Sequence, residues 1–339
     1  MNRRELLDRL LNHEEVPRVP CGFWHHFILG ADQFAGLERP DVLEKAYQGH
    51  LKYFNTVQPD IMKLMNEGFF GYPPIMGKRF EDKEDLLSIK ALGPDHPWIE
   101  RQVEHVKRLV DAFHDEVYCF YNIFSPLQML RIRFDFLDLD YRRFVELAEK
   151  YPREMLEAGK EMQKDVMSLV KRLFHEAGID GIYYCVQNIQ SKLYDESMYA
   201  EIIKPIELPV LELANSISNS NILHICGYAG SVNNFAYYKD YKAKVFNWSV
   251  STDKVSLDEG RKFFKAEAVL GGFPNTPDSL IDCGDKEELR DFALRLIKNN
   301  GFKDYIMGAD CSVPNDIDDT RLRFIRDCCH EFAQEYFKG

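Results

Sequence analysis

The chain has 339 residues, 45% of them hydrophobic, which is enough to fill one large core or two smaller ones. Its 55 acidic residues outnumber its 43 basic ones, and the formal net charge of -12, with no basic patch, argues against binding to nucleic acid or to an anionic membrane surface. No stretch approaches the roughly 20 apolar residues of a membrane span, and the N-terminus is too charged for a signal peptide.

Eight cysteines occur without a regular framework, which indicates free thiols in a reducing compartment. We therefore expect a soluble, cytoplasmic protein.

An amphipathic helix, with Leu6, Leu7, Leu10 and Leu11 on one side, opens the chain. After it, short apolar runs alternate with longer segments of helical periodicity. The runs predict strands over residues 19–27, 60–66, 117–124, 181–187, 221–227, 244–250, 268–274 and 305–313. A helix between two strands returns the chain to the same end of the sheet, so these strands pair in parallel.

Eight such units predict an α/β fold, a (β/α)₈ TIM barrel forming one domain over residues 1–339. A doubly wound open sheet is the alternative. Residues 71–98 are the least regular part, with four prolines, and predict a long loop with a short helix over one rim.

A barrel of this kind carries its active site at the carboxyl ends of its strands. Three residues at those ends, Glu67, Asn66 and His25, are candidates for proton transfer or substrate orientation. Candidates for substrate contacts are Trp24, His26, Tyr121, Gln187, Asn247, Trp248 and Asn275. The alternative is structural: strand-end carboxylates often pair with a lysine or cap a helix, and aromatic residues there often belong to the core.

One strand places His224 and Cys226 two residues apart, so both side chains point to the same face. An imidazole and a thiolate offer two ligands to a borderline-soft ion such as Zn²⁺. Cys311, near the end of the eighth predicted strand, is the candidate third ligand. Taken alone, a His-x-Cys pair in a strand is more often a packed histidine beside an inert thiol.

Several segments match one family in order and spacing: RVPCGFW (18–24), QPDIMKLMNEGFFGYP (58–73), HEAGIDGIYY (175–184), LHICGYAG (223–230), VLGGFPNT (269–276) and YIMGADCSVPNDI (305–317). The chain resembles the uroporphyrinogen decarboxylase superfamily, and within it the corrinoid-dependent methyltransferases. That resemblance implies a (β/α)₈ barrel and a zinc ion held by His224, Cys226 and Cys311.

The decarboxylase branch of the same superfamily carries an arginine-rich element after the first strand, where it binds the carboxylates of the substrate. Residues 23–34 of this chain, FWHHFILGADQF, contain no arginine, and the essential aspartate of that branch corresponds to Asn66 or Glu67. A uroporphyrinogen-decarboxylase-like lyase and a non-catalytic small-molecule-binding protein are the alternatives to a methyltransferase.

The resemblance implies transfer of a methyl group between a corrinoid and a small molecule. A zinc-held thiol would attack the methyl group of a methyl-corrinoid, or the oxygen of a methyl ether would bind zinc while reduced cobalt takes the methyl. We expect the corrinoid to arrive on a separate carrier protein. The sequence leaves the oligomeric state open, with a homodimer among the alternatives.

Overall fold

The computed structural model describes residues 1–188, 192–193, 195–227 and 231–336, with side chains to residue 334; the last three residues of the quoted segment 223–230 lie outside this part. Seven strands form one sheet in the order β1 to β7, and every neighbouring pair is parallel. The strands are β1 (Ile61–Leu64), β2 (Tyr118–Phe124), β3 (Gly181–Val186), β4 (Ile222–Ile225), β5 (Val245–Trp248), β6 (Ala268–Phe273) and β7 (Tyr305–Ala309).

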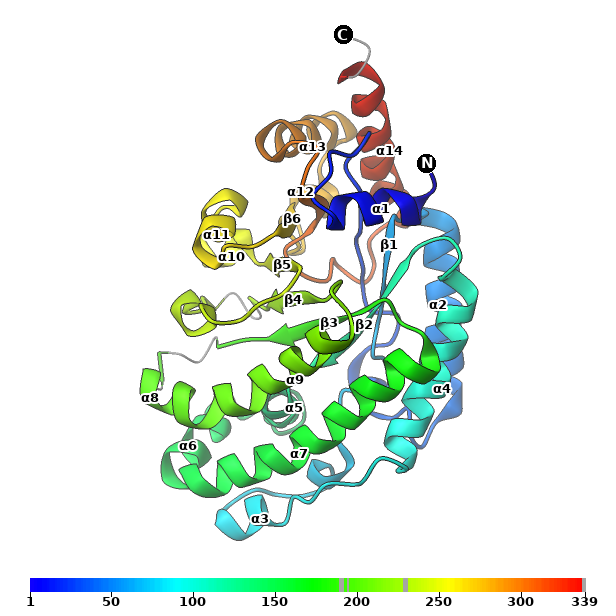
Figure 1. Ribbon diagram of the computed structural model, residues 1–339. Coiled ribbons are helices and arrows are strands. Elements are labelled where there is room, and N and C mark those ends of the chain that lie inside the picture. The colour runs from blue at the N-terminus through cyan, green and yellow to red at the C-terminus, as the bar shows by residue number, and fades with distance from the viewer. Residues whose placement is uncertain (189–191, 194, 228–230, 337–339) are drawn as a thin grey trace.

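Helices connect consecutive strands and lie outside them (Figure 1). The α-helices are α1 (Arg3–Leu11), α2 (Pro40–Val57), α3 (Lys83–Leu87), α4 (Pro97–Phe113), α5 (Pro126–Arg133), α6 (Arg143–Lys150), α7 (Pro152–Arg172), α8 (Glu196–Met198), α9 (Lys204–Ile217), α10 (Val250–Asp253), α11 (Leu257–Phe264), α12 (Leu280–Cys283), α13 (Lys286–Asn300) and α14 (Asp319–Tyr336). Short 3-10 and π turns add η1 (Gly30–Phe34), η2 (Pro73–Ile75), η3 (Phe134–Asp138), η4 (Leu173–Ala177), η5 (Tyr199–Ile203) and η7 (Phe235–Tyr238).

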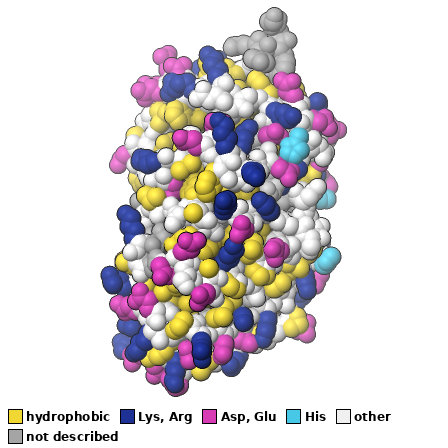
Figure 2. All heavy atoms as spheres, turned by 60° about the vertical axis from the view of Figure 1, so that its left-hand side comes forward, with side chains coloured by type: hydrophobic (Ala, Val, Ile, Leu, Met, Phe, Trp, Pro, Cys, Tyr) yellow, Lys and Arg dark blue, Asp and Glu magenta, His cyan; other side chains and the backbone are white. Residues whose placement is uncertain are grey.

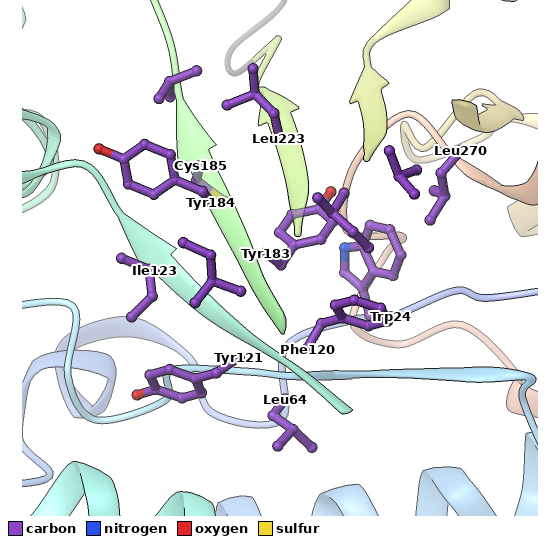
Figure 3. Close-up of a cluster of buried hydrophobic side chains, with 14 of the residues drawn as sticks. Trp24, Leu64, Phe120, Tyr121, Ile123, Tyr183, Tyr184, Cys185, Leu223 and Leu270 are labelled. Atoms are coloured by element: carbon purple, nitrogen blue, oxygen red, sulfur yellow. The ribbon is translucent and has the colours of Figure 1, made fainter. Parts of the chain in front are cut away.

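The strands are buried on both faces, as expected where helices cover a parallel sheet. Successive residues alternate between the faces. Figure 3 shows the result on β3: the ring of Tyr183 points toward Trp24 inside the curved sheet, while Tyr184 points away from it. The hydroxyl of Tyr184 donates to the carbonyl oxygen of Glu207 on α9. The inner face of the sheet therefore has its own aromatic core.

The segment before α2 lies between the two edge strands. The Gly22 amide donates to the Met307 carbonyl at 2.9 Å and the Met307 amide to the Pro20 carbonyl at 2.8 Å, which makes a parallel bridge to β7. On the other side, the Asp60 amide donates to the Cys21 carbonyl at 2.8 Å, next to β1. Seven of the eight predicted strands are thus formed in a TIM-barrel-like arrangement, and the first is reduced to this bridging segment.

The prediction of a full strand over residues 19–27 is wrong, and the backbone partners explain why. The carbonyl of Phe23 accepts from the Tyr53 hydroxyl, and that of Trp24 accepts from the Val313 amide, so neither continues a ladder. The bridging segment and β7 also approach each other closely. A Cβ on Gly308 would lie 2.7 Å from the Gly22 carbonyl oxygen. Only glycine fits at such a contact.

The predicted long loop over residues 71–98 contains η2 and the short helix α3, as expected. Its far end is fixed by Asp165 of α7, whose carboxylate accepts from the Tyr72 hydroxyl at 2.6 Å and from the amides of Leu92 at 2.6 Å and Gly93 at 3.0 Å. The loop is therefore fastened against the outer layer.

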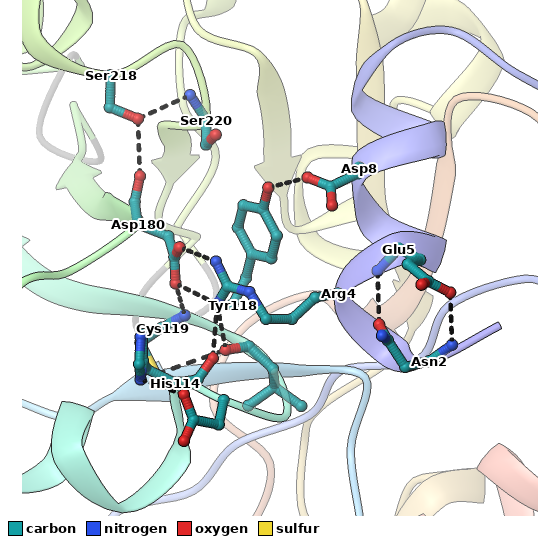
Figure 4. A network of polar contacts seen from close by, with 12 residues as sticks. Asn2, Arg4, Glu5, Asp8, His114, Tyr118, Cys119, Asp180, Ser218 and Ser220 are labelled. Atoms are coloured by element: carbon teal, nitrogen blue, oxygen red, sulfur yellow. Dashed lines mark hydrogen bonds and ion pairs between the residues drawn. The ribbon is translucent and has the colours of Figure 1, made fainter.

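Helix α1 is attached to the starts of β2 and β3 through one carboxylate. Asp180 accepts from both terminal nitrogens of Arg4, at 2.5 and 3.1 Å, and from the Cys119 amide at 2.7 Å (Figure 4). The ring of Tyr118 lies under the same guanidinium. These contacts place the N-terminal helix across the amino ends of the strands.

Figure 2 shows the side of the molecule that carries α8, α10 and α11 in Figure 1. Acidic and basic side chains are interspersed there around exposed hydrophobic ones, so this face shows no extended patch of one sign. In the described part of the chain, each helix is too short or too polar to cross a membrane.

A buried ion pair fixes the bridging segment to β1. Arg18 donates to the two carboxylate oxygens of Asp60 at 2.5 and 2.6 Å, and Asp60 also accepts from the Cys21 amide. Replacing Arg18 by Met leaves the Asp60 carboxylate buried without its cation, and we expect the free energy of unfolding to fall by about 3–5 kcal/mol. Chemical denaturation measures this loss.

The matched control is Arg9→Met, because Arg9 pairs with Glu14 at the surface. Exposed pairs contribute little, so this variant should lose less than about 1 kcal/mol. Equal losses in the two variants would show that the pair at Asp60 does not hold the segment in place.

Glu207 of α9 is fully buried between helices and strands. Its carboxyl group accepts from the Ser125 hydroxyl at 2.8 Å and from the Tyr241 hydroxyl at 3.1 Å. Burial raises its pKa to about 7, and the hydroxyl donors offset only part of that effect. Below about pH 7 the folded protein therefore keeps this group protonated.

A carboxyl group with a raised pKa stabilises the fold below its unfolded pKa and loses that contribution as the pH rises through about 7. We expect the wild type to lose roughly 3 kcal/mol from this group between pH 4.5 and pH 8. Glu207→Gln should remove most of that loss, measured by denaturation across this range. Glu212→Gln on the exposed side of α9 is the control, and an unchanged pH profile in the Glu207 variant would contradict the assignment.

Candidate metal centre and cavity

The ends of β4 and β7 bring together three side chains that could hold a metal ion. Ligand atoms of His224, Cys226 and Cys311 all lie within 4.8 Å of one another. The backbone hydrogen bonds of the sheet continue just beyond both strands. The Cys226 amide donates to the Val186 carbonyl, and the Asp310 amide donates to the Phe273 carbonyl. Strands β5 and β6 separate β4 from β7 in the sheet, so its curvature is what allows the two ends to meet.

The sulfur atoms of Cys226 and Cys311 are 3.9 Å apart. A disulfide requires about 2.05 Å, whereas two sulfurs bound at about 2.3 Å to one tetrahedral ion stand about 3.8 Å apart. Neither ring nitrogen of the buried His224 has a hydrogen-bond partner among the described residues. A buried imidazole without partners is costly, so the donor set and its spacing both fit a zinc ion.

The two thiols differ in acidity. The pKa of Cys311 lies well below the usual range, first because Cys226 donates a hydrogen bond to its sulfur and then because His224 and Lys63 favour the thiolate. The pKa of Cys226 is raised, because it donates that bond and is buried. A divalent ion between the sulfurs would favour the thiolate at both positions.

Packing fixes the ring of His224. It lies 5.1 Å from the ring of Tyr183, centroid to centroid, and tilted by 33°. The Tyr183 hydroxyl donates to Asn247 at 2.5 Å, and the Asn247 amide donates to the carbonyls of Leu270 and Ala309. The interior of the sheet thus orients the histidine through an aromatic contact rather than through a hydrogen bond to the ring.

A hydrogen bond from Asn233 holds the backbone carbonyl of Cys226. The side-chain amide of Asn233 donates to the Cys226 carbonyl at 3.0 Å, and the Asn233 backbone amide donates to Asp253 of α10 at 2.8 Å. Burial raises the pKa of Asp253 to about 6, and the hydrogen bonds from Asn233 offset part of that rise.

A cavity of about 460 Å³ opens directly over the three ligands. Its size suits a small-molecule ligand. One part of its wall is apolar, formed by Phe70, Phe124, Ile132, Phe136 and Pro277. Polar side chains line the rest, among them His26, Asn122, Gln128, Gln187, Asn275 and Ser312.

Three of the predicted substrate-contact residues line this cavity, namely His26, Gln187 and Asn275. The Asn275 amide donates to the Ser312 carbonyl at 2.9 Å, which holds the residues after Cys311 in place. The side-chain oxygen of Gln187 is buried without a hydrogen-bond partner among the described residues.

Glu67 and Asn66 do not line the cavity themselves but contact residues that do. A buried oxygen of Glu67 accepts from Nδ1 of His26 and from the Phe27 amide, both at 3.1 Å. Nε2 of His26 then faces Ser312, whose hydroxyl is 3.4 Å away. Asn66 accepts from the Asn122 amide at 2.6 Å. These two of the three predicted catalytic residues therefore can act on a ligand only through His26 and Asn122, which line the cavity.

Four other predicted site residues have their polar groups engaged away from the cavity. Nε2 of His25 lies 2.9 Å from a carboxylate oxygen of Asp319, and the Tyr121 hydroxyl donates to Gln102 of α4. Asn247 makes the interior hydrogen bonds described above. Trp248, the next residue, points to the opposite face and donates from Nε1 to the Val255 carbonyl.

Trp24 likewise lies in the interior, where its ring packs edge-on against Tyr183 at 5.0 Å. The placement of Tyr121, Asn247, Trp248 and Trp24 does not favour the direct substrate contacts predicted from the sequence. His25, predicted as a catalytic candidate, does not line the cavity either. Strand-end position predicted these residues, but the strand pleat and the early turn after Trp24 decide which side chains reach the cavity.

Sequence reasoning missed several residues that do line the cavity, chiefly Lys63, Gln128, Arg131 and Cys185. Lys63 and Cys185 lie within apolar strand segments. A single polar residue in such a segment was the feature that could have indicated a cavity-lining position. Gln128 and Arg131 lie on α5 directly after β2, a helix whose residues in Pro126–Arg133 are all buried. Burial raises the pKa of Cys185 to about 12, so it remains a thiol.

Comparison with known proteins agrees with this geometry. The family model for uroporphyrinogen decarboxylase (URO-D) matches residues 69–332, most of the chain. The chain belongs to this family. The match confirms the superfamily that the sequence segments indicated. A search of curated proteins found no match.

Among solved structures, a methyltransferase from Methanosarcina mazei is similar over 98% of this chain and 99% of its own, with a TM-score of 0.68 and 14% identity. A B12-independent methionine synthase from Shewanella sp. W3-18-1 is similar over 96% and 100%, with a TM-score of 0.58 and 14% identity. At this identity the likeness shows the shared fold alone.

The geometry predicts a measurable metal content. Protein purified without added zinc should contain about one zinc per chain, and Cys226→Ser or Cys311→Ser should lower that content sharply, because each removes one of three ligands. Elemental analysis of the purified variants gives the stoichiometry. Cys283→Ser, at an exposed cysteine, is the matched control. Full zinc retention in either ligand variant would remove that residue from the site.

Proposed function

We propose that this protein is a zinc-dependent methyltransferase, which moves a methyl group between a corrinoid on a separate carrier protein and a small thiol, methyl ether or other methylated molecule. The observation that carries the proposal is the convergence of His224, Cys226 and Cys311 at the wall of a cavity of about 460 Å³. The proposal includes a cytoplasmic location, which rests on the free thiols that the sequence predicts.

The family match and the fold shared with a Methanosarcina mazei methyltransferase support methyl transfer. The other neighbour is by its name B12-independent, so dependence on a corrinoid rests on the resemblance in sequence. When bound, zinc would supply a Lewis acid that favours the anionic form of a substrate sulfur or oxygen.

The residues around the centre have distinct tasks in this proposal. His224, Cys226 and Cys311 hold the ion, and Tyr183 fixes the imidazole ring. His224 is buried, whereas Cys226 and Cys311 are partly exposed to the cavity, so a substrate in the cavity can reach the ion that they would hold.

Proton transfer is assigned to His26. Its Nδ1 donates to Glu67, which leaves Nε2 as the acceptor on the cavity side. From that position Nε2 can take a proton from a substrate thiol as the sulfur becomes a nucleophile, or return one to a leaving oxygen. Glu67 acts through His26 by holding the ring in place.

Two alternatives make different predictions. A metal-free lyase of the same family keeps its activity in the presence of a chelator. The described residues that line the cavity include Lys63 and Arg131 as cations, few for a substrate with many carboxylates. A binding protein without turnover shows no methyl transfer under any condition.

Methyl transfer to or from free methylcobalamin tests the proposal, since the absorbance of the corrinoid changes when its methyl group is exchanged. We expect turnover by the wild type with one of a panel of thiols and methoxylated compounds. Cys311→Ser should lower kcat/KM about 100-fold or more, because it removes a metal ligand.

Cys283→Ser should behave as the wild type. A chelator should abolish activity, and added zinc should restore it. Activity that survives complete zinc removal would overturn the proposal in favour of the metal-free alternative.

A further inference from the structure

Lys63 is a buried cation at the base of the cavity. It lies on β1, within an otherwise apolar strand, and the residue is 5% exposed. Its ammonium group makes no hydrogen bond or ion pair with a carboxylate in the described part of the chain, and it lines the cavity. A buried ammonium without a carboxylate partner is uncommon, because burial of an unpaired charge is costly.

Aromatic rings surround this ammonium group. Nζ lies 3.9 Å from the ring centroid of Tyr183 and 4.9 Å from that of Trp24. Ring faces attract a cation, but they supply no hydrogen-bond acceptor for its three N–H donors. Burial lowers the pKa of Lys63, while the nearby groups Cys185, Cys311, Cys226 and Glu67 act in the opposite direction.

The cavity as a whole has the same imbalance. Among its described lining residues there is neither aspartate nor glutamate, although the chain has 55 acidic residues and a net charge of -12. The second lining cation, Arg131, is paired with Asp135. Lys63 is thus the charge that a ligand entering the cavity would meet.

The rest of the wall suits an apolar group. The lining includes the apolar side chains of Phe70, Phe124, Ile132 and Phe136. The rings of Phe70 and Phe124 pack edge-on, with their centroids 5.0 Å apart, and so fix each other's position. A ligand with an apolar body can lie against this wall while one end reaches the floor.

We propose that the cavity binds a small organic anion, whose charged oxygen group pairs with Lys63 and whose apolar body lies against the phenylalanine wall. This names the class of the small substrate and in that respect rests on the proposed function. The anion site itself can be measured without methyl transfer. The competing interpretation is that Lys63 only balances the negative charge of the cysteine ligands.

Benzoate is the probe, and benzyl alcohol is its neutral counterpart of similar size. Isothermal titration of purified, zinc-containing protein compares the wild type with Lys63→Met, which keeps the length and apolar stem of the side chain. We expect Lys63→Met to bind benzoate about tenfold more weakly, the effect of one charge-assisted hydrogen bond. Binding of benzyl alcohol should be unchanged.

Two controls accompany this measurement. Lys52→Met changes the net charge equally at an exposed position of α2 and should bind benzoate as the wild type does. Lys63→Arg keeps the charge and should retain a preference for benzoate over benzyl alcohol. Zinc content is measured in every variant, so that a change at the metal is not mistaken for a change at Lys63.

Equal benzoate affinity in the wild type and Lys63→Met, or equal loss of both probes, would overturn the anion site. The methyl-transfer assay is read separately. Turnover without Lys63-dependent benzoate binding refutes this inference alone, and Lys63-dependent binding without turnover refutes the proposed function alone.

Discussion

The curvature of one parallel sheet is the constraint on which the site depends. His224 and Cys226 belong to β4, and Cys311 follows β7, with two strands between them. In a flat sheet, strands spaced about 4.8 Å apart would put these ends about 14 Å from one another. The observed sulfur-to-sulfur distance of 3.9 Å exists because the sheet bends and residues 20–22 hold its two edges together.

The interior of the sheet supports the site in a second way. Tyr183 contacts both the ring of His224 and the ammonium group of Lys63, so a single aromatic side chain connects the candidate metal centre to the buried cation. Asn247 fixes its hydroxyl. Predicted as a wall contact, Asn247 instead belongs to the layer that determines where the wall residues point.

Periodicity was sufficient to predict most of the fold, because each strand is an apolar run bounded by amphipathic helices. It failed at residues 19–27, where tertiary hydrogen bonds from Tyr53 and Val313 replace a ladder. The candidate ligands His224, Cys226 and Cys311 were identified through the resemblance to the family, because buried strand cysteines such as Cys119 and Cys185 are common and do not by themselves indicate a metal site. For the remaining residues, side-chain direction determines whether they line the cavity. Trp248 and Tyr121 point outward and Lys63 points inward, and position at a strand end does not specify that direction.

The bridging segment also bears on how the chain is made. Residues 20–22 leave the ribosome early, but one of their two partners, Met307, is synthesised on the order of tens of seconds later. Until then the inner face of the sheet and its free edges are open to other chains. Other contacts of this segment, such as the hydrogen bond from the Val313 amide to the Trp24 carbonyl, also wait for the C-terminal part of the chain. Closure of the sheet is therefore expected to be a late event in synthesis.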